Sequence, residues 1–162
     1  MIDLAVEVVR SKKRKRTMQA YVVDGKLRVL VPAGLPPDEE SRLVESMVAR
    51  ATRKLTSAGI DLAVRAGQLA TTYGLPIPSS VDWSDRQLRR WGSCTSDGSI
   101  RISNRVASMP GWVLDWVLIH ELAHLEVPNH GPRFQALVGR YELSERAKGY
   151  LIAKGEERLS PR

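Results

Sequence analysis

The chain has 162 residues and a formal net charge of +7, from 25 Lys and Arg against 18 Asp and Glu. With 43% hydrophobic and 27% charged residues it has a globular composition, which excludes a disordered chain, a collagen and a coiled-coil rod. No apolar run approaches the roughly 18 residues of a membrane span, and the first residues lack the positive charge of a secretory signal. We therefore expect a cytoplasmic protein with no membrane partner. The single cysteine, Cys94, excludes an internal disulfide.

Three short segments rich in Val and other strand formers open the chain, at residues 4–9, 18–23 and 27–31. Asp24-Gly25, between the last two, is a strong signal for a tight hairpin turn. The segments predict an antiparallel sheet within residues 1–34, which a cluster of prolines then ends.

A basic run joins the first two of these strands and carries much of the net charge. Without its six cations the formal charge would fall from +7 to +1, and they are Arg10, Lys12, Lys13, Arg14, Lys15 and Arg16. Such a cluster can bind the phosphates of a nucleic acid. The alternative is a solvated hairpin tip, because no aromatic side chain for base stacking lies within the run.

The remainder of the chain predicts mainly helices. Apolar residues recur at helical spacing and turn residues separate the segments, which predicts helices near residues 38–56, 61–73, 112–125, 132–141 and 144–158, with strands at 80–83 and 99–106. These elements indicate an α+β fold, an N-terminal antiparallel sheet followed by a helical core over residues 35–162, in one compact domain.

The sequence His120-Glu121-Leu122-Ala123-His124 is an H-E-x-x-H motif inside the apolar helix at 112–125. Residues four apart lie one turn apart on the same helix face, so the two imidazoles can converge on one metal ion while Glu121 reaches a neighbouring water. From the three His and ten Glu of the chain, about 0.003 chance matches are expected. The alternative is a pair of hydrogen-bonded core histidines.

His130 is the third and last histidine of the chain, and turn formers surround it. The chain can therefore leave the helix and fold this side chain back to the same ion. Three protein ligands with one open position are typical of a catalytic zinc site. A surface histidine is the alternative, with Glu142 or Glu145 as the third ligand.

A zinc ion in this site predicts amide hydrolysis. Zinc lowers the pKa of water to near 7, Glu121 accepts the proton, hydroxide attacks a polarised carbonyl, and Glu121 returns the proton to the departing amine. Because the ligands must be neutral imidazoles, activity and zinc retention are expected to fall below about pH 6.

The strand at 99–106 lies shortly before the metal helix. If it is a sheet edge beside the zinc, an extended peptide could pair with its backbone, which makes Ile100, Arg101 and Ile102 the expected substrate-binding residues. An interior strand is the alternative.

Three further blocks accompany the motif. They are Arg90-Trp91-Gly92-Ser93-Cys94, Gly98-Ser99-Ile100-Arg101-Ile102 and Asn129-His130. With these blocks the chain resembles the YgjP-like bacterial zinc metallopeptidases, relatives of the SprT-like group. The resemblance implies a compact zincin-type core of the gluzincin kind, with His120, His124 and His130 as zinc ligands and Glu121 as the catalytic base.

The segment of residues 90–94 has its own interpretations. Gly92 is expected to allow a backbone conformation that other residues resist. Trp91 and Cys94 are either parts of the cleft or core residues, and Cys94 could also be a zinc ligand. Tyr141 and Arg133 are candidates for stabilising the oxyanion.

The sequence thus favours a monomeric zinc peptidase that acts on peptides or unfolded proteins. Two alternatives remain. One is a nucleic-acid-associated protein that docks through the basic run, with or without proteolysis of DNA-bound proteins. The other is a zinc-folded scaffold without turnover.

Overall fold

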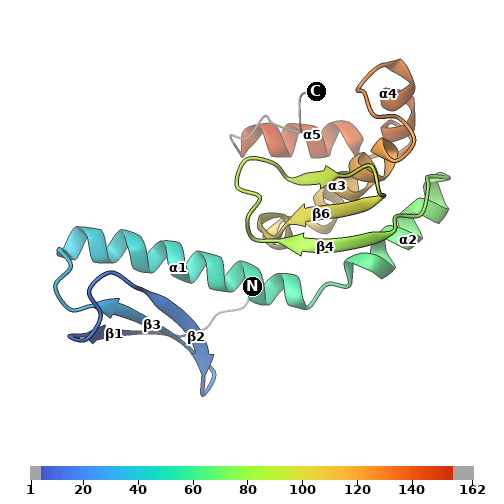
Figure 1. Cartoon of the computed structure of the whole chain (residues 1–162). Coiled ribbons are helices and arrows are strands. Elements are labelled where there is room, and N and C mark those ends of the chain that lie inside the picture. Colours follow the sequence, from blue (N-terminus) through green and yellow to red (C-terminus); the bar gives the residue numbers. More distant parts are fainter. Residues whose placement is uncertain (1–4, 155–162) are drawn as a thin grey trace. The chain divides into compact units, whose positions relative to one another are not determined.

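A computed structural model describes residues 5–154 of the chain. The chain divides into two compact units, Met1–Ala58 (unit 1) and Gly59–Arg162 (unit 2). Each unit combines a three-stranded sheet with helices, so the expected α+β class is confirmed (Figure 1). Within residues 5–154, no helix has both the length and the apolar character that crossing a bilayer requires.

Unit 1 consists of strands β1 (Val6–Ser11), β2 (Gln19–Val23) and β3 (Lys26–Pro32) and the long helix α1 (Pro37–Ala58). The Asp24-Gly25 turn joins β2 to β3 with φ angles of 49° and 70°. Two successive positive φ values are what a tight type I′ hairpin turn requires, as the Asp-Gly signal predicted.

The core of unit 1 lies between the sheet and α1. It comprises Leu27, Val29 and Val31 of β3, against which Val8, Met18, Ala20, Leu35, Val44, Met47, Val48 and Ala51 pack. The structure thus divides the chain differently from the expected boundary at residue 34. The apolar face of α1 covers the N-terminal sheet, so this helix belongs with the sheet and not with the later helices.

The pairing within the first sheet also differs from the expected consecutive hairpins. The strand order is β1-β3-β2, in which β3 pairs antiparallel with β2 but parallel with β1. The sheet is therefore mixed, and only the β2–β3 pair matches the expected antiparallel arrangement. The basic run is therefore a connection that passes from one edge strand to the other, and not the tip of a hairpin, because β3 inserts between β1 and β2.

Unit 2 contains the second sheet and the remaining helices. In chain order its elements are α2 (Leu62–Tyr73), β4 (Ser80–Ser84), β5 (Gly92–Cys94), β6 (Ser99–Ser103), a 3₁₀ turn η1 (Asn104–Ser108), α3 (Gly111–His124), α4 (Pro132–Val138) and α5 (Ser144–Ala153). The Asp61 carboxylate accepts from the backbone N–H of Val64 and caps α2. The Ser144 hydroxyl at the start of α5 accepts a hydrogen bond from the Trp116 indole at 2.9 Å.

The second sheet has the order β4-β6-β5, with β6 parallel to β4 and antiparallel to β5. The expectation that the strand after residue 99 forms a sheet edge is therefore wrong, because both sides of β6 are paired. The edge strand on the α3 side is β5, a three-residue strand that the polar sequence before residue 99 did not indicate.

Helix α3 forms the centre of unit 2. It is apolar nearly all round, and ten of its residues are buried, from Val113 to Ala123 with the exception of Asp115. Helices α2, α4 and α5 and strands β5 and β6 all contact it. The structure therefore holds this helix in position from several sides.

Candidate metal centre

Helix α3 presents the H-E-x-x-H residues at its C-terminal end. His120 and Glu121 are buried, each with 4% of its surface exposed, while His124 is half-buried. The chain leaves α3 after His124 and reaches His130 through the Pro128-Asn129 turn. The sequence predicted this return of the chain from the turn formers around His130.

The three imidazoles meet at their Nε2 atoms. These atoms are 3.2 Å apart between His120 and His124, 3.1 Å between His124 and His130, and 3.2 Å between His130 and His120. A hydrogen bond needs one donor per pair, so three mutually close nitrogens cannot all be satisfied by one another. Three lone pairs directed at one point form a site for a cation.

Two contacts hold the rings in this arrangement. His124 Nδ1 lies 3.1 Å from the carbonyl oxygen of Val127, so a proton on Nδ1 leaves Nε2 free as a ligand atom. Phe134 of α4 packs against all three imidazoles, with ring centroids 4.8, 4.5 and 4.7 Å from those of His120, His124 and His130. The sequence indicated Phe134 only as a core residue, because its spacing shows an apolar helix face but not what that face covers.

The donor set fits a divalent zinc ion. Tetrahedral nitrogen ligands at about 2.0–2.1 Å from zinc lie roughly 3.3–3.4 Å apart, close to the separations of these atoms. Burial, together with the two neighbouring imidazoles, lowers the pKa of His120 well below its ordinary value. The ring is therefore neutral and able to ligate. The alternative ligands Glu142 and Glu145 are both exposed, and Glu145 accepts a hydrogen bond from Lys148.

Glu121 lies beside this triangle in a tightly enclosed place. Burial raises the pKa of its carboxyl group to about 8, against a smaller opposing effect of the positive charge of Arg90. A carboxylate with a raised pKa is a stronger base, which suits a group that must accept a proton from water.

The backbone of Gly92 in β5 encloses the Glu121 side chain. A Cβ atom at Gly92 would lie 2.6 Å from Glu121 Oε1 and 2.7 Å from its Cγ. The φ angle of Gly92 is not positive, so the expectation of an unusual backbone conformation is wrong. This position needs glycine because β5 approaches Glu121 too closely for any side chain.

These groups line one cavity of about 430 Å³. Its walls come from α3, the loop after α3, and the segment that includes β5: Arg90, Ser93, Cys94, Thr95, Ser96, His120, Glu121, His124, Pro128 and His130. The structure thus brings together His120, Glu121, His124 and His130 with Arg90, Ser93 and Cys94 of the segment at residues 90–94, whereas Trp91 is a core residue. Thr95 and Ser96 had no sequence signal, because only the position of β5 places them there.

Several expected residues lie elsewhere. Ile100 and Ile102 of β6 are fully buried in the core, and neither they nor Arg101 line the cavity. The Tyr141 hydroxyl donates to the carbonyl of Trp112, and Arg133 pairs with Glu126. Neither of these two oxyanion candidates lines the cavity.

Cys94 lines the cavity but has the properties of a protonated thiol. Its Sγ lies 3.5 Å from the carbonyl oxygen of Thr95, and burial raises its pKa to about 11. A zinc ligand must be a thiolate, and a raised pKa opposes its formation. The zinc-ligand interpretation of Cys94 therefore loses support.

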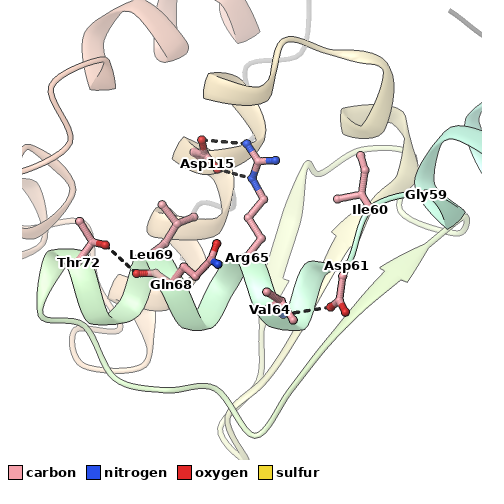
Figure 2. A pocket seen from close by; sticks show the side chains of 9 residues that line it. All are labelled: Gly59, Ile60, Asp61, Val64, Arg65, Gln68, Leu69, Thr72 and Asp115. Carbon is pink, nitrogen blue, oxygen red and sulfur yellow. Dashed lines mark hydrogen bonds and ion pairs between the residues drawn. The ribbon is translucent and has the colours of Figure 1, made fainter.

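A second hollow, of about 540 Å³, lies along α2 (Figure 2). Its charged groups are already used: the Arg65 guanidinium forms two hydrogen bonds with Asp115 of α3, and Asp61 caps the helix. This ion pair links α2 to α3. The hollow is thus part of the packing between these helices and presents no free catalytic group.

Comparison with known proteins gives two results. The family model described as "YgjP-like, metallopeptidase domain" matches residues 8–144. The chain is similar in structure to the metallopeptidase zymogen abylysin of Pyrococcus abyssi, with a TM-score of 0.52 and 19% identity over 59% of this chain and 96% of that one. It is also similar to the metallopeptidase zymogen jannalysin of Methanocaldococcus jannaschii, with a TM-score of 0.50 and 16% identity over 59% of this chain and 97% of the other. No curated protein sequence matches.

Proposed function

The chain belongs to the YgjP-like metallopeptidase family, and we propose that it is a zinc-dependent peptidase in which Glu121 is the general base. The observation that carries this proposal is the single cavity that contains three converging imidazole nitrogens and a buried carboxylate. His120, His124 and His130 would hold the metal. Three nitrogen ligands leave one coordination position open, as a catalytic zinc site requires.

A bound zinc ion supplies Lewis acidity, which lowers the pKa of water and polarises a substrate carbonyl. The residues of the chain perform the proton transfers. Glu121 accepts the proton of the attacking water and afterwards donates it to the amine that leaves, so one carboxyl group acts first as base and then as acid. The close approach of the Gly92 backbone restricts the Glu121 side chain to one position, so its carboxylate stays at the wall of the cavity.

Strand β5 gives the substrate a place to bind. One side of β5 pairs with β6, and within the described part of the chain no strand pairs with the other side. Ser93 and Cys94 of this strand line the cavity. An extended peptide could add to the free edge through main-chain hydrogen bonds. This edge replaces Ile100, Arg101 and Ile102 as the proposed substrate contact, since the hydrogen-bonding groups of β6 are used within the sheet.

The test combines metal analysis with proteolysis of an unfolded protein, for the parent chain and for Glu121→Gln. We expect about one equivalent of zinc in both, and a loss of about 10²–10⁴-fold in kcat for the variant. His120→Ala should lose both the metal and the activity. Equal activity in parent and Glu121→Gln would contradict the assignment of the base, and so would a protein that binds no metal.

The two alternatives make different predictions. A scaffold without turnover would hold zinc and cleave nothing in either chain. A nucleic-acid-binding protein would depend on the basic run, whose residues lie in unit 1. The family and the fold favour the peptidase over both.

A further inference from the structure

The metal cavity has an unequal distribution of charge. Of its lining residues other than the imidazoles, Arg90 is the one cation and Glu121 carries the one carboxyl group, while Ser93, Cys94, Thr95 and Ser96 are uncharged at neutral pH. Under the proposed function the metal adds two positive charges and Glu121 serves as the base. The cavity then has more positive than negative charge. The charge of Arg90 lowers the pKa of Glu121, but Arg90 is neither a metal ligand nor a proton donor or acceptor in the proposed reaction.

Arg90 is exposed, and no described carboxylate forms an ion pair with it. Four other arginines are held in ion pairs: Arg10 pairs with Glu40, Arg28 with Glu7, Arg65 with Asp115 and Arg133 with Glu126. A guanidinium that faces a cleft without a partner can bind a carboxylate through two parallel N–H donors.

The chain around Arg90 is fixed, which gives the guanidinium a constant anchor. Arg105 donates to the carbonyl of Leu88 at 2.6 Å, and its guanidinium lies 4.1 Å from the Trp91 ring centre. Ser103 donates from its hydroxyl to the carbonyl of Gln87 and from its backbone N–H to that of Trp91, at 2.9 and 2.8 Å.

These contacts involve residues on both sides of Arg90 in the sequence. Trp91 is buried with 2% of its surface exposed, and Gly92 lies against Glu121. The backbone of Arg90 is thus held two residues from the strand that borders the catalytic base. Such a position is suited to selecting a substrate, because the backbone does not have to become ordered when the substrate binds.

We propose that Arg90 is a specificity-determining residue that selects peptides with a carboxylate close to the scissile bond. This inference rests on the proposed peptidase function and deepens it. The carboxylate can come from an Asp or Glu side chain or from the C-terminus of the peptide. The chemistry at Arg90 is the same for both sources, and the experiment below separates them.

The experiment uses four peptides of one sequence that differ near the cleavage site. One has an internal Glu and an amidated C-terminus, one has Gln and a free C-terminus, one has Gln and an amidated C-terminus, and one has Lys with an amide. The enzymes are the zinc-loaded parent, Arg90→Gln, Arg90→Lys, and Arg89→Gln as the matched control, since Arg89 is exposed but does not line the cavity.

For the parent we expect kcat/KM about tenfold higher for a carboxylate peptide than for the neutral peptide, mainly through KM, because a charge-assisted hydrogen bond is gained. Arg90→Gln should remove this preference, Arg90→Lys should keep part of it, and Arg89→Gln should keep all of it. A preference for the Glu peptide assigns the side chain as the source. A preference for the free C-terminus assigns the terminal carboxylate and exopeptidase action.

The proposal is overturned if the parent shows no preference, or if Arg90→Gln slows all four peptides equally through kcat. Binding of the same peptides to zinc-loaded Glu121→Gln, measured by fluorescence anisotropy, separates this failure from failure of the proposed function. If nothing is cleaved but the carboxylate peptides still bind more tightly through Arg90, the function is wrong and the selection by Arg90 stands. If binding also ignores the carboxylate, the selection by Arg90 is wrong.

Discussion

The two units of the molecule differ in whether they bury ionisable side chains. In unit 1 the described cations and carboxylates lie at or near the surface, as in the pairs of Arg10 with Glu40 and of Arg28 with Glu7. In unit 2 the chain buries His120 and Glu121 almost completely, with 4% exposure each. Among the histidine, acidic, lysine and arginine side chains of residues 5–154, only these two are buried.

This difference indicates which part of the chain contains a functional site. Burying an ionisable group costs free energy unless it is paired, so a fold that does so without a complete set of partners has a function to maintain. His120 Nδ1 has no hydrogen-bond partner within residues 5–154. The charges of unit 1 are conspicuous in the sequence, whereas the few buried groups of unit 2 lie in the proposed active site.

The largest effect that would sharpen this comparison is expected at Gly92. In Gly92→Ala the new Cβ would meet Glu121 at 2.6–2.8 Å, so the carboxylate must move. Because a displacement of about 1 Å can cost about 10²-fold in rate, we expect kcat to fall by that order while zinc remains bound. Peptide hydrolysis and metal analysis would measure both.

Gly67→Ala is the matched control for this variant. A Cβ at Gly67, in the middle of α2, has nothing within 4 Å. It should leave kcat unchanged and stabilise the helix by up to about 1 kcal/mol. Full activity of Gly92→Ala would show that the enclosure of Glu121 has no part in catalysis.

A second prediction concerns the separate cores of the units. Leu27 is 1% exposed in the core of unit 1, and Leu118 is fully buried in α3. Either Leu→Ala substitution should lower the free energy of unfolding of its own unit by about 2–5 kcal/mol. Only Leu118→Ala should also weaken zinc retention, because Leu118 belongs to α3, the helix that carries His120 and His124. Chemical denaturation with a zinc assay would test this, and metal loss in Leu27→Ala would contradict the separation of the units.

A third prediction uses the pH dependence of Cys94. Burial, then the charges of Glu121 and Asp97, raises the pKa of its thiol from 9.0 to about 11. Because the folded state holds this proton more tightly, the stabilisation is complete below pH 9 and is lost as the pH rises toward 11. The rate of alkylation should rise with a midpoint near 11 in the folded protein and near 9 in denaturant. A folded midpoint near 9 would contradict the burial.

The smallest effect is expected for the basic run. Lys12, Lys13, Lys15 and Arg16 are exposed, and they lie in unit 1. Changing all four to Gln should alter the free energy of unfolding by no more than about 0.5 kcal/mol and leave peptide hydrolysis unchanged. Binding to DNA at about 50 mM salt, lost in the variant and steeply weakened by added salt, would show that unit 1 has an electrostatic function of its own.

The local elements were largely predictable because they depend on neighbours in sequence. Asp24-Gly25 specifies a hairpin turn, Asp61 and Gly74 mark the ends of α2, and the apolar run at 112–125 predicts a buried helix. The pairing of β1 with β3 and the short strand β5 were not predictable. Each depends on contacts between residues far apart in sequence, which no local pattern records.

The proposed metal site likewise has some features that the sequence predicts and others that it does not. By itself the sequence determined that His120, Glu121 and His124 share one end of a helix, because the α-helical repeat dictates the spacing. Only the tertiary structure decided that Phe134 supports the three rings, that Gly92 encloses the base, and that β5 rather than β6 is the free edge. Those relations arise from packing between segments that are distant in the chain, so they exist only once the unit has folded.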